Sequence, residues 1–349
     1  MQQFDTISIA IPKKAIQGIN EPKFALTTQT DCLTGATSDK YQLKSSNCPI
    51  GISKLIWNTG ADMLLTFSAK VLNDDYLTGI TKENWFRGID ALTDIIQVDA
   101  DMIYNDALVH RCDSTNNIWL KDIGTDQKTI CTSLLSAKAN DRFKEYSYNK
   151  KTQKGIEFRG TQTEKNRIII YSKHLDLLKY QNKDFLKSLS NPTKVYNDAE
   201  KQLRFEVNHT HFKSLRNRFE VQTNSLKNLL NSPAPVNHNF LKKVLSTKEI
   251  KQTRLFDEYL KFNNDAFAFI EYKGLQSIIK ELNYQDQTIK DFFKNMFPDE
   301  NTFKYHWYRK KNNIKSIMQF MNSERFKIDA SYTDTITNKV LQELKKAVA

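Results

Sequence analysis

The chain has 349 residues, 39% of them apolar and 26% charged, a composition typical of a globular protein long enough for two domains with separate cores. Its 52 lysines and arginines outnumber its 40 acids, and the net charge of +12 favours a polyanionic partner, either nucleic acid or an acidic membrane surface. The absence of a long apolar run, of a signal-peptide pattern at residues 1–5 and of any CxxC pair argues against a membrane span, secretion and a zinc or disulfide scaffold.

The first part of the chain mixes segments of strand and helix periodicity. Apolar residues at every second position are typical of half-buried strands, and a spacing of three and four residues is typical of helices. Strands are predicted at residues 6–11, 54–57, 63–67, 108–113, 143–148, 155–159, 167–173 and 203–212. Helices are predicted at residues 85–96, 130–139 and 175–189.

The pattern changes at Ser232-Pro233-Ala234-Pro235, because two prolines in three positions cannot continue a helix. We therefore expect one domain at residues 1–231 and a second at 236–349. Helices are predicted in the second at residues 239–245, 255–262, 275–283, 288–297, 314–322 and 334–348. The fold class is α+β: an antiparallel sheet domain followed by a mostly helical region for DNA binding or assembly.

Positive charge concentrates between Arg142 and Lys187, where twelve lysines and arginines face five acids within 46 residues. Aromatic residues are interleaved with these cations: Phe143, Tyr146, Tyr148, Phe158 and Tyr171. Cations that neutralise phosphates, beside rings that stack on bases, are typical of single-stranded DNA binding, although a solvated hairpin face remains the alternative. The candidate DNA-binding residues are Arg142, Lys144, Lys150, Lys151, Lys154, Arg159, Lys165 and Arg167.

A second basic and aromatic cluster covers residues 304–311 and continues to Lys315 without an acid. Arg309, Lys310 and Lys311 are candidates for contacts with duplex phosphates. A helix whose aromatic residues fill a core while its cations face water fits the pattern equally well.

The segment from Arg167 to His174 holds the best candidate for catalysis. On a strand, Tyr171 and Lys173 share one face, and a polar sheet edge would place them together at the surface. The pKa of a tyrosine is near 10, so a neighbouring cation is needed to favour the nucleophilic phenolate. A structural tyrosine at a sheet edge is the alternative, and Tyr180, a second candidate, is expected to be structural.

Two carboxylates on separate strands could hold a divalent metal. Asp113 is expected to share a strand face with Arg111 and Val109, and Glu206 to point away from its apolar neighbours. Brought together, the two would suit Mg²⁺ or Mn²⁺, which prefer oxygen ligands. Each could equally be a surface acid in an ion pair.

His209 and His211 are further candidates for metal ligands, because they are one residue apart. On a continuous strand both lie on the face of Phe205, opposite Glu206. The histidines and Glu206 could therefore serve one site only if a bulge intervened.

These segments together resemble the replication initiators of filamentous phages, the gene II protein family, and their plasmid relatives. The stretches that carry the resemblance, in the family's order, are Ser68-Ala-Lys-Val-Leu72, Gly79-Ile80, Arg111-Cys-Asp113, Tyr171-Ser-Lys-His-Leu-Asp-Leu177, Leu186-Lys-Ser-Leu-Ser-Asn-Pro192, Leu203-Arg-Phe-Glu206 and Phe212-Lys-Ser-Leu215. They span roughly residues 55 to 220. The resemblance implies that Tyr171 is the nucleophile, Lys173 a neighbour of the scissile phosphate, and Asp113 and Glu206 metal ligands. His209 and His211 match no histidine pair of the family.

The resemblance implies an initiator of rolling-circle replication in the cytoplasm of a bacterial host, with a sheet like that of the HUH endonucleases or a degenerate relative. Tyr171 would cut one strand of origin DNA and form a 5′-phosphotyrosine. A host polymerase would extend the free 3′-OH, and a host helicase is expected because no GxxxxGK[ST] motif is present. A relaxase or transposase with the same chemistry, a non-catalytic single-strand binder and a membrane-surface protein are the alternatives.

Overall fold

The structure, a computed structural model, describes residues 1–30, 34, 36–138, 142–148, 155–160, 167–245, 271–275, 277, 286–297, 299–322 and 330–347. The chain forms two compact units. The first consists of Met1–Cys131, Asp141–Val244 and Asn338–Ala349, and the second of Thr132–Asn140 and Leu245–Thr337. The expected division at residues 232–235 differs from this one, because the helix that follows the prolines packs on the sheet of the first unit.

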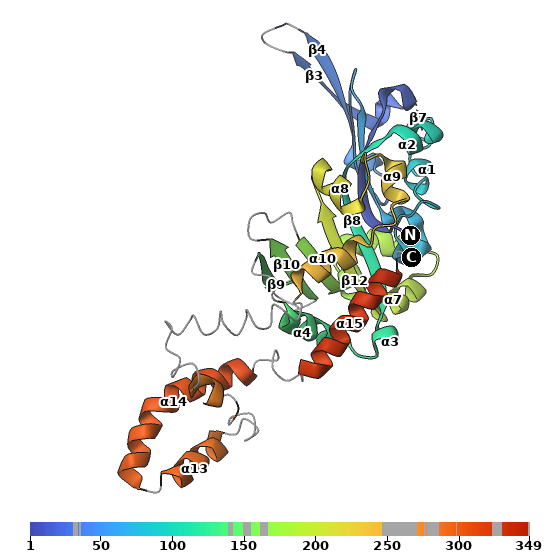
Figure 1. Ribbon diagram of the computed structural model, residues 1–349. Helices are drawn as coiled ribbons and strands as arrows, with labels where there is room; N and C mark the ends of the chain where they lie inside the picture. The colour runs from blue at the N-terminus through green and yellow to red at the C-terminus, as the bar shows by residue number, and fades with distance from the viewer. Residues whose placement is uncertain are drawn as a thin grey trace. The chain divides into compact units, whose positions relative to one another are not determined.

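An antiparallel sheet of ten strands dominates the first unit (Figure 1). Its order is β3-β4-β5-β6-β1-β8-β12-β11-β10-β9. The strands are β1 (Phe4–Ile11), β3 (Phe24–Thr30), β4 (Thr37–Leu43), β5 (Ile52–Asn58), β6 (Met63–Ser68), β8 (Leu108–Trp119), β9 (Phe143–Ser147), β10 (Gly155–Gly160), β11 (Arg167–Ser172) and β12 (Gln202–His209). A small sheet pairs β2 (Ile16–Ile19) with β7 (Ile96–Val98). The α+β class and the antiparallel sheet expected from the sequence are confirmed.

Helices and short 3-10 turns connect the strands. The helices are α1 (Arg87–Asp90), α2 (Ala100–Asp106), α3 (Leu120–Ile123), α4 (Gln127–Ala137), α5 (Lys173–Leu177), α6 (Lys183–Ser188), α7 (Pro192–Glu200), α8 (Phe212–Phe219), α9 (Leu226–Leu230), α10 (Val236–Val244), α13 (Asp286–Met296), α14 (Glu300–Asn322) and α15 (Ala330–Lys346). The 3-10 turns are η1 (Lys13–Ala15), η2 (Glu21–Lys23), η3 (Ser45–Asn47), η4 (Ala69–Thr78) and η5 (Tyr180–Asn182). No helix within these described ranges is long and apolar enough to cross a bilayer.

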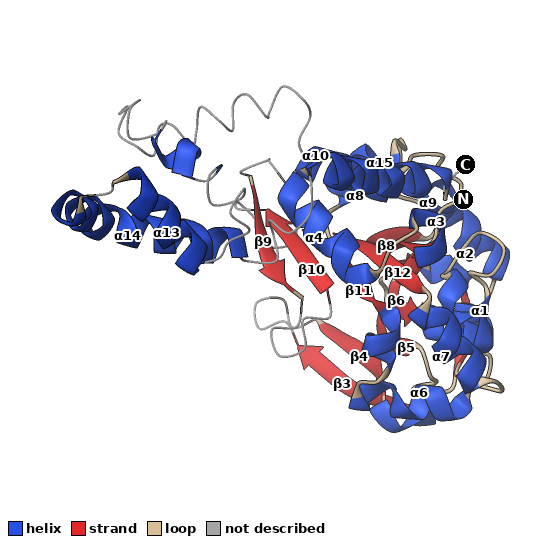
Figure 2. Cartoon of the chain, turned by 90° about the horizontal axis from the view of Figure 1, so that it is seen from below, coloured by secondary structure: helices blue, strands red, loops and turns tan. Residues whose placement is uncertain are grey.

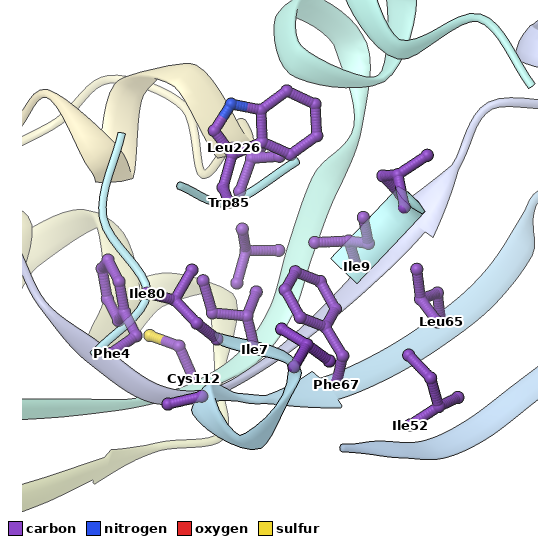
Figure 3. Packing of buried hydrophobic residues seen from close by; sticks show 14 of the residues in the cluster. Phe4, Ile7, Ile9, Ile52, Leu65, Phe67, Ile80, Trp85, Cys112 and Leu226 are labelled. Carbon is purple, nitrogen blue, oxygen red and sulfur yellow. The ribbon is translucent and has the colours of Figure 1, made fainter. Parts of the chain in front are cut away.

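One face of the sheet is apolar because strand side chains alternate between its two faces. Ile7 of β1, Phe67 of β6 and Cys112 of β8 lie on neighbouring strands in register and are buried. Figure 3 shows all three pointing toward the side where Trp85 and Leu226 lie. Farther along the sheet, α10 covers this apolar face, and the rings of Phe240 and Phe143 meet at 5.5 Å.

The opposite face carries polar residues along the same strands, and part of it is covered as well. Elements η4, α5, α6 and α7 pack together over the ends of β11 and β12. Figure 2 shows α10 and α7 on opposite sides of the strands β8, β12 and β11. The polar face is therefore divided into a covered part, beneath η4 and α7, and an open part. We call the open part, with Lys54, Arg111, Lys144, Arg159 and Arg167, the open face.

Three expectations about the elements are corrected. Residues 85–96 form turns around the short α1 and not one helix. Gly88 lies against the Phe67 ring, and hydrogen bonds of the 3-10 type, such as that from the Ile89 N–H to the Phe86 carbonyl, make the turns tighter than an α-helix. Residues 175–189 divide into α5, η5 and α6. The strand expected at 203–212 ends at His209, because residues from Phe212 onward form the amphipathic α8.

The second unit is described in its helical parts only. Helix α13 packs against α14 through Phe293 and Trp307, whose ring centroids are 6.0 Å apart. Helices predicted at 288–297 and 314–322 correspond to α13 and to part of α14. The helix predicted at 334–348 corresponds to most of α15, whose residues from Asn338 onward belong to the first unit. The helix predicted at 255–262 and most of that at 275–283 lie outside the described residues.

A substitution tests the pairing of β10 with β11. A Cβ atom at Gly155 would lie 2.1 Å from the Ile170 carbonyl oxygen and 2.8 Å from the Tyr171 Cβ, too close for any side chain. We expect Gly155→Ala to lower the free energy of unfolding by about 1–3 kcal/mol, measured by chemical denaturation. The control is Gly18→Ala, where the nearest atom would be 3.6 Å away. Equal stability of the two variants would contradict the pairing.

Candidate active site

Tyr171 lies on the polar face of the sheet, with its hydroxyl between an acid and a cation. The hydroxyl donates a hydrogen bond to Glu206 Oε2 at 2.9 Å and accepts one from Lys173 Nζ at 3.1 Å. Glu206 comes from the neighbouring strand β12, and Lys173 is the first residue of α5. The sequence correctly placed Tyr171 and Lys173 together. The expected position at a surface edge of the sheet is wrong, because β11 is an interior strand between β12 and β10 and both side chains are buried. The strand also ends before Lys173, which begins α5.

Lys173 is buried and remains charged because acids surround it. Its Nζ lies 3.4 Å from Asp5 Oδ1 and 3.1 Å from Asp176 Oδ2, and only 4% of the residue is exposed. Burial opposes the charge, but Asp5 and the phenol of Tyr171 outweigh it and hold the pKa of Lys173 well above its usual value. The ammonium is therefore a fixed positive charge beside the Tyr171 oxygen.

Arg204 and Asp5 complete this network, and neither was recognised in the sequence. Arg204 is directly opposite Tyr171 across the strand pair, is fully buried, and forms an ion pair with Asp5. Asp5 lies where the pairing of β1 with β8 shifts register, between Phe4 and Thr6. The alternation of β12 already placed Arg204 on the face of Glu206, whereas no local signal located the bulge that brings in Asp5.

The two oxygen acids of the site have raised pKa values. Burial, followed by the charges of Asp5 and Asp113, raises the pKa of Glu206 to about 7. Burial, followed by the Glu206 carboxylate, raises the pKa of Tyr171 well above its usual value, against the opposing effect of Lys173. At neutral pH Tyr171 is thus a neutral phenol, bonded to a carboxylate that is poised to gain or lose a proton.

Asp113 lies on the same polar face, one strand away from Glu206. It is paired with Arg111, whose Nη2 is 3.1 Å from Oδ2, and it accepts a hydrogen bond from Asn208. Burial raises the pKa of Asp113, while Arg111 and Asn208 act in the opposite direction. Val109, expected on this face, is buried on the other, because a bulge in β8 leaves His110 without a partner on β1.

The metal site predicted from the sequence is only partly assembled. Asp113 and Glu206 lie on the same face of the neighbouring strands β8 and β12, which the sequence had left open. Within the described part of the chain, no three His, Cys, Asp or Glu side chains gather as a metal-binding group. The pair therefore fits only an ion such as Mg²⁺, which is commonly held by one or two carboxylates, with water and substrate phosphates as its other ligands.

His209 and His211 are not part of this site, which corrects their candidacy as metal ligands. His209 is on the apolar face of β12, fully buried, with Nε2 2.9 Å from Ser114 Oγ. Burial, followed by Arg218, lowers its pKa well below the usual value, so the ring is neutral. His211 is exposed beyond the strand, at the start of α8. No bulge turns either ring toward Glu206.

The open face carries part of the predicted DNA-binding set. Lys144, Arg159 and Arg167 lie on the polar face of β9, β10 and β11, and the Arg159 guanidinium is 4.7 Å from the centre of the Tyr146 ring. Phe143 and Phe158 point into the apolar core, so the expectation that they stack on bases is wrong. Arg142 is exposed just before β9. Lys150, Lys151, Lys154 and Lys165 lie outside the described residues.

The second basic cluster lies on α14. Tyr305 and Tyr308 are exposed there, and Arg309 donates a hydrogen bond to the Tyr305 hydroxyl. Lys310 is paired with Glu271, and the Lys311 ammonium lies 5.5 Å from the centre of the Tyr308 ring. The cluster thus presents both cations and rings to solvent. Tyr180, the second candidate tyrosine, is 89% exposed on η5 and far more accessible than Tyr171.

The raised pKa of Glu206 makes stability depend on pH. The folded pKa of about 7 exceeds the ordinary 4.5, so the folded protein binds the proton more tightly and loses stability as pH rises through 7. Between pH 5 and 8 the free energy of unfolding of the natural protein should fall, and in Glu206→Gln we expect this fall to be smaller by about 1–3 kcal/mol. Urea unfolding at both pH values measures the difference. Identical pH dependence in the two proteins would contradict the raised pKa.

Comparison with known proteins identifies no relative. No family model, no curated protein and no solved structure matches the chain. The resemblance to the phage initiators therefore depends on the sequence motifs, and the function has to be inferred from the geometry around Tyr171.

Proposed function

We propose that the protein cuts and rejoins one strand of DNA, with Tyr171 as the nucleophile. One observation carries the proposal: the Tyr171 hydroxyl lies between Glu206 and Lys173, within hydrogen-bond distance of both. A tyrosine nucleophile needs a base to take its proton and a positive charge to stabilise the phenolate. Both groups are in place, and the base has a pKa near the pH at which it would act.

The reaction begins when Glu206 takes the phenolic proton. The Tyr171 oxygen attacks phosphorus, the bond from phosphorus to the 3′ oxygen breaks, and that oxygen takes a proton from water. The products are a 5′-phosphotyrosine and a free 3′-OH. The reverse attack by a 3′-OH restores the strand without ATP, because the phosphodiester energy stays in the covalent bond.

Access to the hydroxyl requires a local movement. Tyr171 is 3% exposed, and the ring of Tyr148 lies against it with a centroid distance of 4.9 Å. Tyr148 follows β9 and is itself partly exposed. In this proposal the scissile phosphate approaches beside the partly exposed Glu206 and displaces the Tyr148 ring.

A divalent metal, Mg²⁺ or Mn²⁺, is part of the proposal. Asp113 and Glu206 are the residues that would hold it. Asp113 would be the lasting ligand, because Glu206 cannot bind the ion well while it carries the phenolic proton, and the ion would supply Lewis-acid polarisation of the phosphate. The Arg111 guanidinium, which pairs with Asp113, lies beside these carboxylates on the open face, and its side chain is exposed to solvent. DNA phosphates would follow this face across Arg111, Arg167 and Lys144.

The biological setting belongs to the same proposal. The motifs shared with the gene II protein family favour a rolling-circle initiator that acts on origin DNA in a bacterial cytoplasm, with a host helicase and polymerase, and a sheet related to that of the HUH endonucleases. A relaxase or transposase would use the same tyrosine on a different DNA end. Cleavage of origin-bearing strands, transfer origins or transposon ends separates these enzymes.

A second function, binding of single strands without cleavage, is favoured by one observation. The Tyr171 hydroxyl is buried, whereas the cations of the open face are accessible. In a binding protein the network around Tyr171 would only hold η4 and α5 on the sheet.

Covalent capture of DNA distinguishes the enzyme from the binder. We expect the natural protein, with labelled origin-bearing single strand and Mn²⁺, to form an adduct that survives denaturing electrophoresis and maps to Tyr171. Tyr171→Phe should abolish the adduct and keep DNA affinity, and Glu206→Gln should slow its formation about 10²–10⁴-fold. Tyr180→Phe, at an exposed tyrosine, is the control. An adduct on another residue, or none at all, would overturn the nuclease proposal.

The proposed path of the phosphates predicts the salt dependence of binding. Each cation that neutralises a phosphate adds about one to the slope of log affinity against log salt, so Arg111→Gln with Lys144→Gln should reduce that slope by about 1–2. Lys242→Gln on α10 is the control, because α10 covers the opposite face. Fluorescence anisotropy with single-stranded DNA measures the slopes. A larger effect of Lys242→Gln would place the DNA elsewhere.

A further inference from the structure

Helix α14 of the second unit has two aromatic faces, and the proposed reaction uses neither. Phe303 is buried, and the Trp307 ring meets the Phe293 ring of α13 at 6.0 Å, so one face packs against the neighbouring helix. Tyr305 and Tyr308 are 60% and 68% exposed. The second aromatic face is therefore open to solvent and available to a partner.

The exposed face combines a polar ridge with cations on both of its sides. At about 100° of rotation per residue, four exposed residues fall within a strip roughly 60° wide along the helix. We call them the α14 ridge: Asn301, Tyr305, Tyr308 and Asn312. By the same count, Arg309 lies beyond one side of the ridge and Lys311 beyond the other.

The charges of these two cations are not neutralised by the protein. Within the described residues, neither Arg309 nor Lys311 forms an ion pair, and each lies instead against a ring of the ridge, at 5.7 and 5.5 Å from its centre. The ion pairs that α14 does form use other lysines, Lys304 with Glu300 and Lys310 with Glu271. No acid occurs in the sequence from 304 to 322. The face therefore attracts a polyanion.

The shape of the face favours double-stranded over single-stranded DNA. Proteins hold single strands in basic grooves, whereas the α14 ridge is the convex surface of a helix. A helix about 10–12 Å across fits the major groove of B-DNA, which is ~12 Å wide and has a phosphate chain on each side. Cations on both sides of the ridge match two such chains, and a single strand offers only one.

An anionic membrane is the other polyanionic surface that these cations would attract. Helices that lie in a bilayer interface present large apolar residues to the acyl chains, opposite their cations. In α14 the apolar side chains of Phe303 and Trp307 face α13, and the ridge contains two asparagines. Duplex DNA therefore fits this face better than a membrane does.

We propose that α14 binds in the major groove of duplex DNA, with the ridge toward the base edges and with Arg309 and Lys311 on the phosphates of the two strands. Asparagine amides and tyrosine hydroxyls can form hydrogen bonds with base edges there. The inference goes beyond the proposed function, because it assigns a different ligand, duplex DNA, to a different surface, and it does not require cleavage by Tyr171.

Fluorescence anisotropy with the full chain tests the proposal, with Tyr171→Phe present to prevent cleavage. The probes are a duplex of about 20 base pairs and one of its strands alone. We expect Arg309→Gln with Lys311→Gln to weaken duplex binding about tenfold and to reduce its salt slope by about 2, with single-strand affinity unchanged. The control, Lys290→Gln with Lys294→Gln, removes the same charge from exposed positions on α13 and should change neither affinity.

A modified duplex tests the position in the groove. Glucosylated 5-hydroxymethylcytosine in place of cytosine fills the major groove, because C5 of a pyrimidine projects into it. We expect the protein to bind this duplex about tenfold more weakly than the unmodified one, and the difference should disappear in the Arg309 and Lys311 double variant. Equal affinity for the two duplexes would overturn the proposal.

Other outcomes would also reject it. One is an equal loss of duplex affinity in the α13 control, and another is a larger loss for the single strand than for the duplex. Binding to phosphatidylserine vesicles that depends on Arg309 and Lys311, without such dependence for duplex DNA, would assign the face to membranes instead.

The result is separable from that of the nuclease proposal. Adduct formation by the natural protein, together with duplex binding that ignores the α14 variant, would reject the role of α14 and keep Tyr171 as nucleophile. Duplex binding that depends on Arg309 and Lys311, in a protein that never forms an adduct, would keep α14 as a DNA-binding helix and reject the nuclease.

Discussion

Two cations, the Lys173 ammonium and the Arg204 guanidinium, are buried on the polar face of the sheet and share the carboxylate of Asp5. An isolated buried charge costs several kcal/mol, so each of these groups is tolerable only while the others are present. The partners come from β1, β12 and the start of α5, which are far apart in sequence. The ring of Tyr76 from η4 covers both cations, at 5.2 and 5.4 Å. The network thus fixes the bulge of β1, the strand order and the position of the cover together.

The same network determines the protonation of Tyr171. Lys173 favours the phenolate, whereas burial and the Glu206 carboxylate favour the phenol, and the phenol prevails. When Glu206 gains the proton, its negative charge disappears and only the fixed cation remains beside the oxygen. Transfer of one proton therefore removes the main electrostatic obstacle to the phenolate. A tyrosine with Lys173 but without Glu206 would have no nearby group to take that proton.

The sequence predicted the strands well where apolar residues alternate, as in β1, β6 and β10, and where β-branched residues form a run, as in β11. It also placed Tyr171 beside Lys173, whereas Glu206 reaches the same face only through the pairing of β11 with β12, which the sequence did not predict. A β-bulge interrupts the alternation of side chains between the two faces. The bulge in β8 therefore places Val109 on the face opposite to the expected one, and the bulge in β1 is the reason why Asp5 was not predicted to lie in the site. The strands β3 and β4 were missed because both of their faces are largely polar and exposed, so they show no alternation. Tertiary packing also broke the helix expected at 85–96, where Gly88 has to admit the ring of Phe67.

The two parts of the polar face differ in charge: cations predominate on the open face, and carboxylates line a cavity in the covered part. Among the described residues of the open face, the cations Lys54, Arg111, Lys144, Arg159 and Arg167 lie with the acids Asp113 and Glu157, and both acids already pair with neighbouring arginines. In the cavity beneath η4 and α7 the balance is reversed. A strand laid along the open face would meet cations with its phosphates, and Glu206 and Tyr171 lie at the boundary of that face. In the proposed reaction that boundary is where a phosphate would be held for attack by Tyr171, so the arrangement of charge would favour binding and chemistry at one place.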